Sequence, residues 1–240
     1  MPSLRAAALT DIGRVRRQNE DRFLLDEPAR IFGVADGVGG LPGGAEAAQQ
    51  TVDDITAGIH AVTGGQEPNL TAIVHRANEN VLALGKRISP SMGIGTTLTF
   101  GWVHDTALKI AHVGDSRVYG WRRGELTQIS DDHSVENEAR LRRAKGEVVY
   151  YHEANRNALT RCIGQPTPPA VDLITRPLEA GDRYLFCTDG VTRMVGNTEL
   201  GAILGQPGDP AAVLRELITL AVRRGGPDNA TCVMVFIEAV

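Results

Sequence analysis

The sequence is poor in the features that mark several large protein classes. It has three cysteines in 240 residues, at Cys162, Cys187 and Cys232, and this odd, scattered set excludes a disulfide framework and a zinc site. The formal net charge of -4 leaves no surplus of lysine and arginine for gathering nucleic acid. Apolar runs nowhere approach the roughly 20 residues of a membrane-spanning helix. We therefore expect neither nucleic acid nor a membrane as a partner.

Further absences narrow the function and the location. Residues 1–10 contain only a short run of alanine and leucine, too brief for the apolar core of a signal peptide, so we expect a cytoplasmic protein. The pairs Gly39-Gly40 and Gly43-Gly44 are not followed by Gly-Lys-Ser or Gly-Lys-Thr, which excludes a Walker-type nucleotide site. The chain also lacks Asp-x-Asp, the pattern of phosphatases that form an aspartyl-phosphate.

Short apolar runs that are rich in β-branched residues and bounded by Gly or Asp predict strands. The second and third runs should form a hairpin that the fourth continues, with a turn at Arg123-Gly124 beyond it. The predicted strands cover residues 31–35, 97–103, 108–113, 117–121, 183–188 and 231–237.

Apolar residues at helical spacing predict an amphipathic helix over 70–84. Another helix should begin after an N-cap at Asp209, with Pro210 at its first position, and further helices are predicted over 46–59 and 135–145. Grouped strands and paired helices favour antiparallel sheets covered by helices over a doubly wound parallel sheet. The expected fold class is therefore α+β, with layered packing.

The domain organisation follows from length and composition. With 42% hydrophobic and 22% charged residues, the chain is typical of a globular protein, and we expect one domain over residues 1–240. No internal repeat or linker divides it. Residues 144–157 are polar and without pattern, so a mobile flap is predicted there.

Aspartates follow three of the predicted strands and precede the last one. Asp36 and Asp189 stand in Asp-Gly pairs, Asp115 follows a glycine, and Asp228 lies just before residues 231–237. Each aspartate taken singly is typical of an ordinary turn. Taken together, carboxylates on rigid elements, with no thiolate or histidine ligand beside them, are the hard oxygen ligands that Mg²⁺ and Mn²⁺ bind.

Such a site suits hydrolysis of a phosphate ester. Two ions a few ångströms apart can share a water, lower its pKa and align it for attack on phosphorus. The phosphate also needs a cation, and Arg16 is the candidate because a guanidinium binds oxygens in pairs. Glu20 and Asp21, which follow closely in the sequence, would orient water on the metals.

Seven ordered motifs carry a resemblance to a known family. From about Gly13 to its C-terminus the sequence resembles the metal-dependent protein phosphatases of type 2C (PPM), as a bacterial stand-alone member. The motifs are Asn19-Glu20-Asp21, Asp36-Gly37-Val38-Gly39-Gly40, Gly95-Thr96-Thr97, Val113-Gly114-Asp115-Ser116-Arg117, Asp132-His133-Ser134, Thr188-Asp189-Gly190 and Asp228-Asn229-Ala230-Thr231.

The resemblance implies a four-layer α-β-β-α sandwich of two central antiparallel sheets, with the metal site between the sheets at one end. It implies hydrolysis of phosphoserine and phosphothreonine in proteins by direct attack of a metal-bridging hydroxide. Residues 144–157 correspond to a flap that affects substrate access in bacterial relatives. The implied partners are phosphorylated proteins of bacterial signalling, either substrates of a serine/threonine kinase or the kinase itself, and we expect a monomer.

The resemblance also assigns roles to the aspartates. Asp36 resembles the carboxylate that bridges two metal ions, and Gly37 supplies a backbone carbonyl to one of them. Asp189 and Asp228 complete the ligands of the other ion. Asp115 resembles the ligand, shared with Asp189, of a third and weaker ion. The implied cofactors are two core Mn²⁺ or Mg²⁺ ions, with room for that third one.

Arg16 matches the arginine that holds the substrate phosphate in the family. The chain departs from some relatives at Val38, where they have a histidine assigned as general acid. Protonation of the leaving alcohol then falls to metal-bound water or to an unassigned group. The loop over residues 41–48 also follows the family pattern loosely, which leaves the loop geometry near the metals open.

Two alternatives compete with this interpretation. Cys187 and Arg193 have the Cys-x5-Arg spacing of phosphatases with a cysteine nucleophile, but Asp189 between them would repel both the thiolate and the phosphate. The other alternative is a catalytically weak, phosphoprotein-binding regulatory module on the same fold. Its signature would be the loss of a metal-binding aspartate, and because all of them are present, catalysis is favoured.

Overall fold

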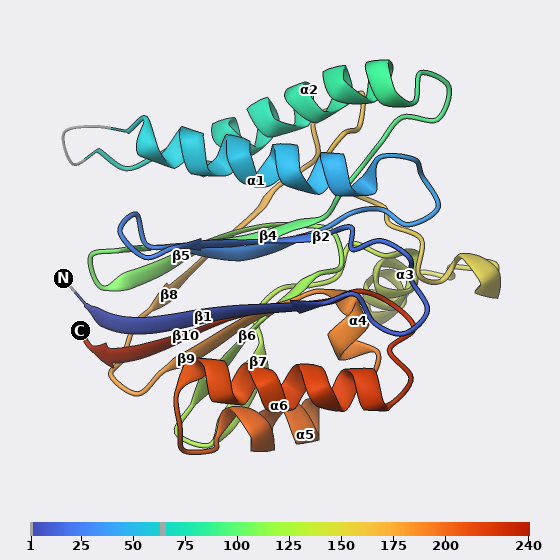
Figure 1. Cartoon of the computed structure of the whole chain (residues 1–240). Helices are drawn as coiled ribbons and strands as arrows, with labels where there is room; N and C mark the ends of the chain where they lie inside the picture. The colour runs from blue at the N-terminus through green and yellow to red at the C-terminus, as the bar shows by residue number, and fades with distance from the viewer. Residues whose placement is uncertain (1, 63–65) are drawn as a thin grey trace.

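A computed structural model describes residues 2–62 and 66–240 of the chain. Figure 1 shows four layers, with helices on each outer side of two stacked sheets. This is the sandwich that the family resemblance implies, and the expected α+β fold class is confirmed. Met1 and residues 63–65, which the expected 1–240 domain includes, lie outside the described residues, and the single domain stays a prediction.

The first sheet contains both the first and the last strand of the described chain. Its antiparallel strands follow the order β1-β10-β9-β6-β7, so β10 lies between β1 and β9. The sheet therefore joins residues that are far apart in the sequence. The strands are β1 (Ser3–Asp11), β6 (Arg117–Arg122), β7 (Glu125–Gln128), β9 (Arg183–Cys187) and β10 (Ala230–Ala239).

The second sheet is also antiparallel, with the strand order β2-β3-β4-β5-β8. The register of β2 against β3 places Asp21 directly opposite Asp36. Two acidic side chains of the candidate site are therefore neighbours across one strand pair. The strands are β2 (Asp21–Asp26), β3 (Ile31–Asp36), β4 (Leu98–His104), β5 (Ala107–Val113) and β8 (Asp172–Pro177).

The helices cover the outer faces of the sheets. Helices α1 (Gly44–His60) and α2 (Leu70–Ile88) lie on the second sheet, and α5 (Asn197–Leu204) and α6 (Pro210–Arg223) lie on the first. The short helix α4 (Asp189–Thr192), the helix α3 (Val135–Ala144) and a 3-10 turn (Glu153–Asn155) lie towards one end of the sandwich (Figure 1). Among the described residues, none of these helices combines the length and apolarity needed to cross a bilayer.

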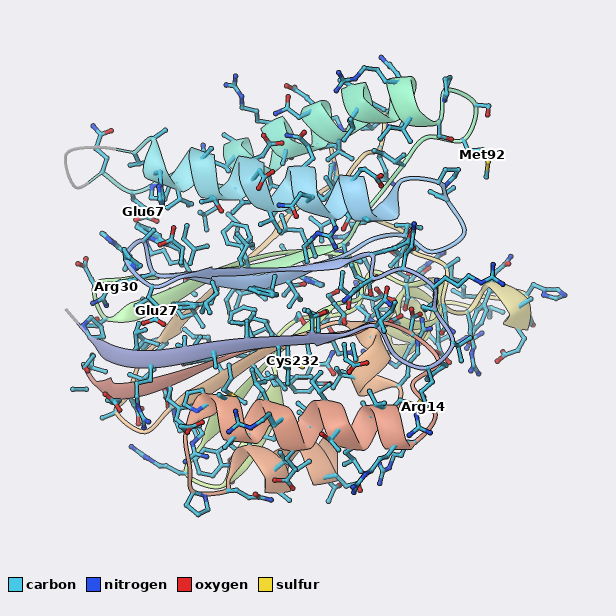
Figure 2. The ribbon with its side chains drawn as sticks, viewed as in Figure 1. Arg14, Glu27, Arg30, Glu67, Met92 and Cys232 are labelled. Carbon is cyan, nitrogen blue, oxygen red and sulfur yellow. The ribbon has the colours of Figure 1, made fainter. Side chains whose placement is uncertain are left out.

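Side chains fill the spaces between the layers (Figure 2). Phe32 and Phe186 extend from opposite sheets into one apolar cluster, and both are fully buried. Burial of side chains of this size stabilises the fold by roughly 1.5–3 kcal/mol each. The two sheets are thereby fixed against each other, so the ends of their strands keep a constant relative position.

One predicted connection is wrong. The hairpin of β4 and β5 is confirmed, but β6 does not continue it. Instead β6 joins the other sheet, where it pairs with β7 and β9. The chain leaves the first hairpin at Gly114, whose φ of 116° is a conformation that favours glycine. The turn predicted at Arg123-Gly124 is confirmed between β6 and β7, and both residues have positive φ.

The start of α6 offers a local test of this fold. Asp209 caps the helix, because its Oδ1 accepts a hydrogen bond from the N–H of Ala212 at 2.6 Å. Asp209→Ala should lower the free energy of unfolding by about 1 kcal/mol, since that amide loses its side-chain acceptor. Denaturant titration measures the loss, and Asp209→Asn, which keeps an acceptor, is the matched control. An alanine variant as stable as the parent would contradict the capping role.

Candidate metal centre

The four aspartates predicted from the strand ends come together at one end of the sandwich. Asp36 ends β3, Asp115 follows β5, Asp189 opens α4 directly after β9, and Asp228 precedes β10. All of them line one cavity of about 470 Å³. Because both sheets contribute, the stacking of the sheets is what brings these carboxylates into a common space.

The sequence predicts only some of the other residues that line this cavity. Arg16 and Gly37 line it, as the sequence predicts. Cys162, Arg193 and residues 157–159 line it as well, although the sequence predicts no place for Cys162 or Arg193 in a metal site. The last group places the end of the predicted flap beside the aspartates. Most of residues 144–157 are exposed, and their mobility stays a prediction.

Two buried carboxylate oxygens in this group have no hydrogen-bond partner in the described parts of the chain. They are Oδ1 of Asp21 and Oδ1 of Asp189. Asp21 is 3% exposed, and only its Oδ2 receives a hydrogen bond from a side chain, from the Oγ1 of Thr188 at 2.9 Å. Burying such an oxygen is costly unless a cation or a proton satisfies it. These atoms therefore favour a bound cation.

The carboxylates strongly perturb one another. Burial raises the pKa of Asp36 well above its usual range, and the charges of Asp21, Asp189, Asp115 and Asp228 raise it further. Burial, followed by the charge of Asp189, raises the pKa of Asp115 to about 7. Burial also raises the pKa of Asp21 to about 6. A divalent cation would reverse these shifts, because it stabilises the ionised form of each group.

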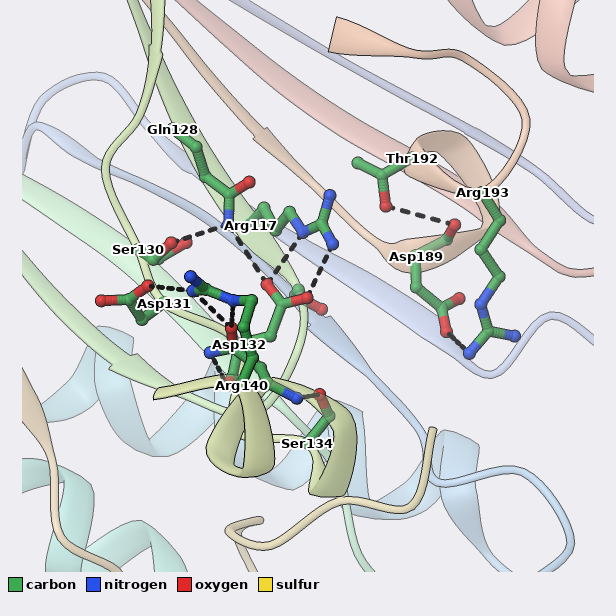
Figure 3. A network of polar contacts seen from close by, with 12 residues as sticks. Arg117, Gln128, Ser130, Asp131, Asp132, Ser134, Arg140, Asp189, Thr192 and Arg193 are labelled. Carbon is green, nitrogen blue, oxygen red and sulfur yellow. Dashed lines mark hydrogen bonds and ion pairs between the residues drawn. The ribbon is translucent and has the colours of Figure 1, made fainter. Parts of the chain in front are cut away.

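Two arginines neutralise part of this negative charge. Nη2 of Arg16 donates a hydrogen bond to Oδ2 of Asp228 at 2.7 Å. Arg193 forms an ion pair with Oδ2 of Asp189 (Figure 3). No three acidic, thiol or imidazole side chains in residues 2–62 and 66–240 are grouped closely enough to hold an ion. An ion that binds Oδ2 of Asp228 therefore competes with Arg16, whereas Oδ1 of Asp189 is not held by Arg193.

Asn229 fastens the loop that carries Arg16. Its Nδ2 donates hydrogen bonds to the carbonyl oxygens of Ile12 at 2.9 Å and Gln18 at 3.0 Å. Its Oδ1 accepts one from the N–H of Glu20 at 2.9 Å. Burial raises the pKa of Glu20, and the charge of Arg16 opposes that shift. The sequence motif includes Asn229, but a clamp between two distant segments is visible only in the structure.

Further polar side chains hold the backbone at Asp36 and Asp115. The N–H of Asp36 donates to the Oγ1 of Thr97 at 3.0 Å. The N–H of Gly114, just before Asp115, donates to Nδ1 of His133 at 3.0 Å. Burial lowers the pKa of His133, which favours the neutral imidazole that can accept this bond. Both aspartates are therefore positioned by their main chain.

The structure contradicts the cysteine-nucleophile alternative. Cys187 is fully buried in β9, in an apolar cluster with Cys232 and Leu217 of α6. A thiol enclosed by apolar side chains cannot attack a phosphate ester in the cavity. Cys162 does line the cavity, but burial raises its pKa to about 11, so it stays a thiol at neutral pH.

Known proteins share both the sequence pattern and the fold. A family model described as protein phosphatase 2C matches residues 14–207. The chain belongs to the protein phosphatase 2C family. The family predicted from the seven motifs is therefore confirmed.

Individual proteins that resemble this chain are also named as phosphatases. The serine/threonine protein phosphatase PstP of Mycobacterium tuberculosis is 35% identical over 96% of this chain, but the match covers only 44% of PstP. A putative protein phosphatase 2C-type of Streptococcus pyogenes is 34% identical over 96% of each chain. The solved catalytic domain of PstP with two manganese ions has a TM-score of 0.82 and 33% identity over 98% of both chains. The chain thus spans less than half the length of PstP.

Gly190 tests how closely the site is packed. A Cβ at Gly190 would lie 1.9 Å from the carbonyl oxygen of Asn229, so Gly190→Ala must push α4 away from the segment before β10. We expect the free energy of unfolding to fall by at least about 2 kcal/mol, as measured by denaturant titration. Gly196→Ala is the matched control, because no atom lies within 4 Å of a Cβ there. Equal losses in the two variants would contradict the close approach.

Proposed function

We propose that this chain is a metal-dependent protein phosphatase that removes phosphate from phosphoserine and phosphothreonine in proteins. The observation that carries the proposal is the meeting of Asp36, Asp115, Asp189 and Asp228 with Arg16 in one cavity. PstP, which matches 96% of this chain, is named a serine/threonine protein phosphatase. That name supports the same chemistry here.

The donor set fits hard divalent cations. Asp36 would bridge two ions, the carbonyl of Gly37 would bind one of them, and Asp189 and Asp228 would complete the other. The unpartnered Oδ1 of Asp189 supports this assignment. When bound, such ions lower the pKa of water and offset the charge of the phosphate. The manganese in the PstP catalytic domain supports Mn²⁺, and Mg²⁺ accepts the same oxygen ligands.

Arg16 would hold the phosphate. It donates one hydrogen bond to Asp228, and a guanidinium has five N–H groups, so donors remain for phosphate oxygens. A Cβ at Gly39 would lie 3.2 Å from both terminal nitrogens of Arg16, so the glycine leaves room for this side chain. Arg117 does not serve this purpose, since it donates hydrogen bonds to both carboxylate oxygens of Asp132 at 2.8 and 2.7 Å (Figure 3).

The acidic residues that follow Arg16 in the sequence would orient water at the ions. Glu20 and Asp21 are partly or fully buried carboxylates beside the cluster, and they would accept hydrogen bonds from water at the ions. Val38 lines the cavity at the position where some relatives have a histidine. Among the described lining residues there is no histidine, so the leaving alcohol would take its proton from water.

The alternative of a catalytically weak, phosphoprotein-binding regulatory module gains no support from the site. Its expected signature would be the loss of a metal-binding aspartate, but all four aspartates line the cavity. The other expectations concern the setting of the protein. A cytoplasmic location, a monomer, and partners among the substrates of a serine/threonine kinase, or the kinase itself, stay predictions.

The proposal is tested by hydrolysis of an aryl phosphate and of a phosphothreonine peptide. A chelator should abolish both activities, and added Mn²⁺ should restore them. Asp36→Asn should lower turnover at least about a hundredfold, because it weakens the binding of both ions. The matched control is Asp105→Asn, whose side chain is 85% exposed in the β4–β5 turn. Near-normal manganese-dependent turnover of the Asp36→Asn variant would overturn the assignment.

Arg16→Ala tests the phosphate contact separately from metal binding. Loss of a charge-assisted hydrogen bond should raise KM for the phosphopeptide about tenfold or more. Binding of Mn²⁺, measured by calorimetry, should persist. Arg17→Ala is the control because that neighbouring arginine is exposed and does not line the cavity. An unchanged KM in the Arg16→Ala variant would mean that another group holds the phosphate.

A further inference from the structure

A second guanidinium group, that of Arg193, lies at the carboxylate cluster besides that of Arg16. Arg193 follows Asp189 by four residues, directly after the short helix α4, and this spacing places both side chains on one face. Its Nη2 is paired with Oδ2 of Asp189 (Figure 3). The Asp189 side chain is 14% exposed, whereas Arg193 is 41% exposed and reaches in from the cavity wall.

The two oxygens of Asp189 face different partners. Oδ1 is buried and has no hydrogen-bond partner among the residues that the structure describes, so it is available to a core ion. Oδ2 is occupied by Arg193. A third ion shared by Asp189 and Asp115 would need an oxygen that Arg193 already holds. The charge of Arg193 also acts on Asp115, which lines the same cavity.

We propose that Arg193 serves as a tethered cation in place of a third divalent ion, so that the chain binds two ions. This inference rests on the proposed function. A guanidinium keeps its charge at every physiological pH and has a fixed attachment one helical turn from Asp189. It therefore neutralises Asp189 and Asp115 without any dependence on the metal concentration. A third ion at that position would be repelled at short range by this positive charge.

Calorimetric titration of Mn²⁺ into the chelator-treated full chain tests the inference. The wild-type chain should bind two ions. Arg193→Ala should open the outer position, so that a third and weaker ion binds, and Arg193→Lys should restore the count of two. The third ion should disappear again in the double variant Arg193→Ala, Asp115→Asn. Circular dichroism before each titration shows that the variants remain folded.

Arg123→Ala is the matched control for loss of an arginine. Arg123 is 81% exposed and pairs with Glu179 in the turn beyond β6, so its loss should leave the count at two. A wild-type chain that binds a third ion, lost in Asp115→Asn, would overturn the inference. A count of two in Arg193→Ala would also overturn it. Both results leave the proposed phosphatase intact, whereas failure of the wild-type chain to bind any Mn²⁺ would overturn the two proposals together.

Discussion

Repulsion between buried carboxylates is the constraint on which the rest of this structure depends. Asp21 and Asp36 are directly opposite each other on β2 and β3, and Asp189 and Asp228 reach the same region from the other sheet. Carboxylates left to themselves would move apart into water or take up protons. They stay together because each lies at or next to the end of an element whose packing is fixed by the apolar layers. The free energy of core burial thus maintains an unfavourable arrangement of charge.

Main-chain positioning makes that arrangement specific. Thr97 accepts a hydrogen bond from the N–H of Asp36. Asn229 links the loop that carries Arg16 to the segment before β10. None of these bonds uses the oxygens that would bind ions. The scaffold therefore fixes where the carboxylates lie and leaves their outer atoms free for ligands. Ions that bind this state should also stabilise the fold, because they bind the folded chain in preference to the unfolded one.

The sequence predicts the aspartates well, because apolar runs that end in Asp-Gly or Gly-Asp are a local signal. Long-range features were harder to predict. The strand β1 has alanine at three successive positions, which is a weak strand signal, and it is stabilised mainly by pairing with β10. The strand β6 follows a hairpin closely, so only the direction of the chain at Gly114 reveals that it joins the other sheet. The Cys-x5-Arg spacing relates Arg193 only to Cys187, whereas its spacing of four residues from Asp189 is the useful signal.

The place of β10 has a consequence for synthesis of the protein. This strand comes last in the sequence but lies inside the first sheet, between β1 and β9. A nascent chain on the ribosome therefore lacks the partner that holds β1, and it lacks Asp228 and Asn229 until nearly all of these residues have been translated. Chain fragments that end before this point cannot assemble the site. The proposed metal centre should thus form only in molecules whose translation has passed β10.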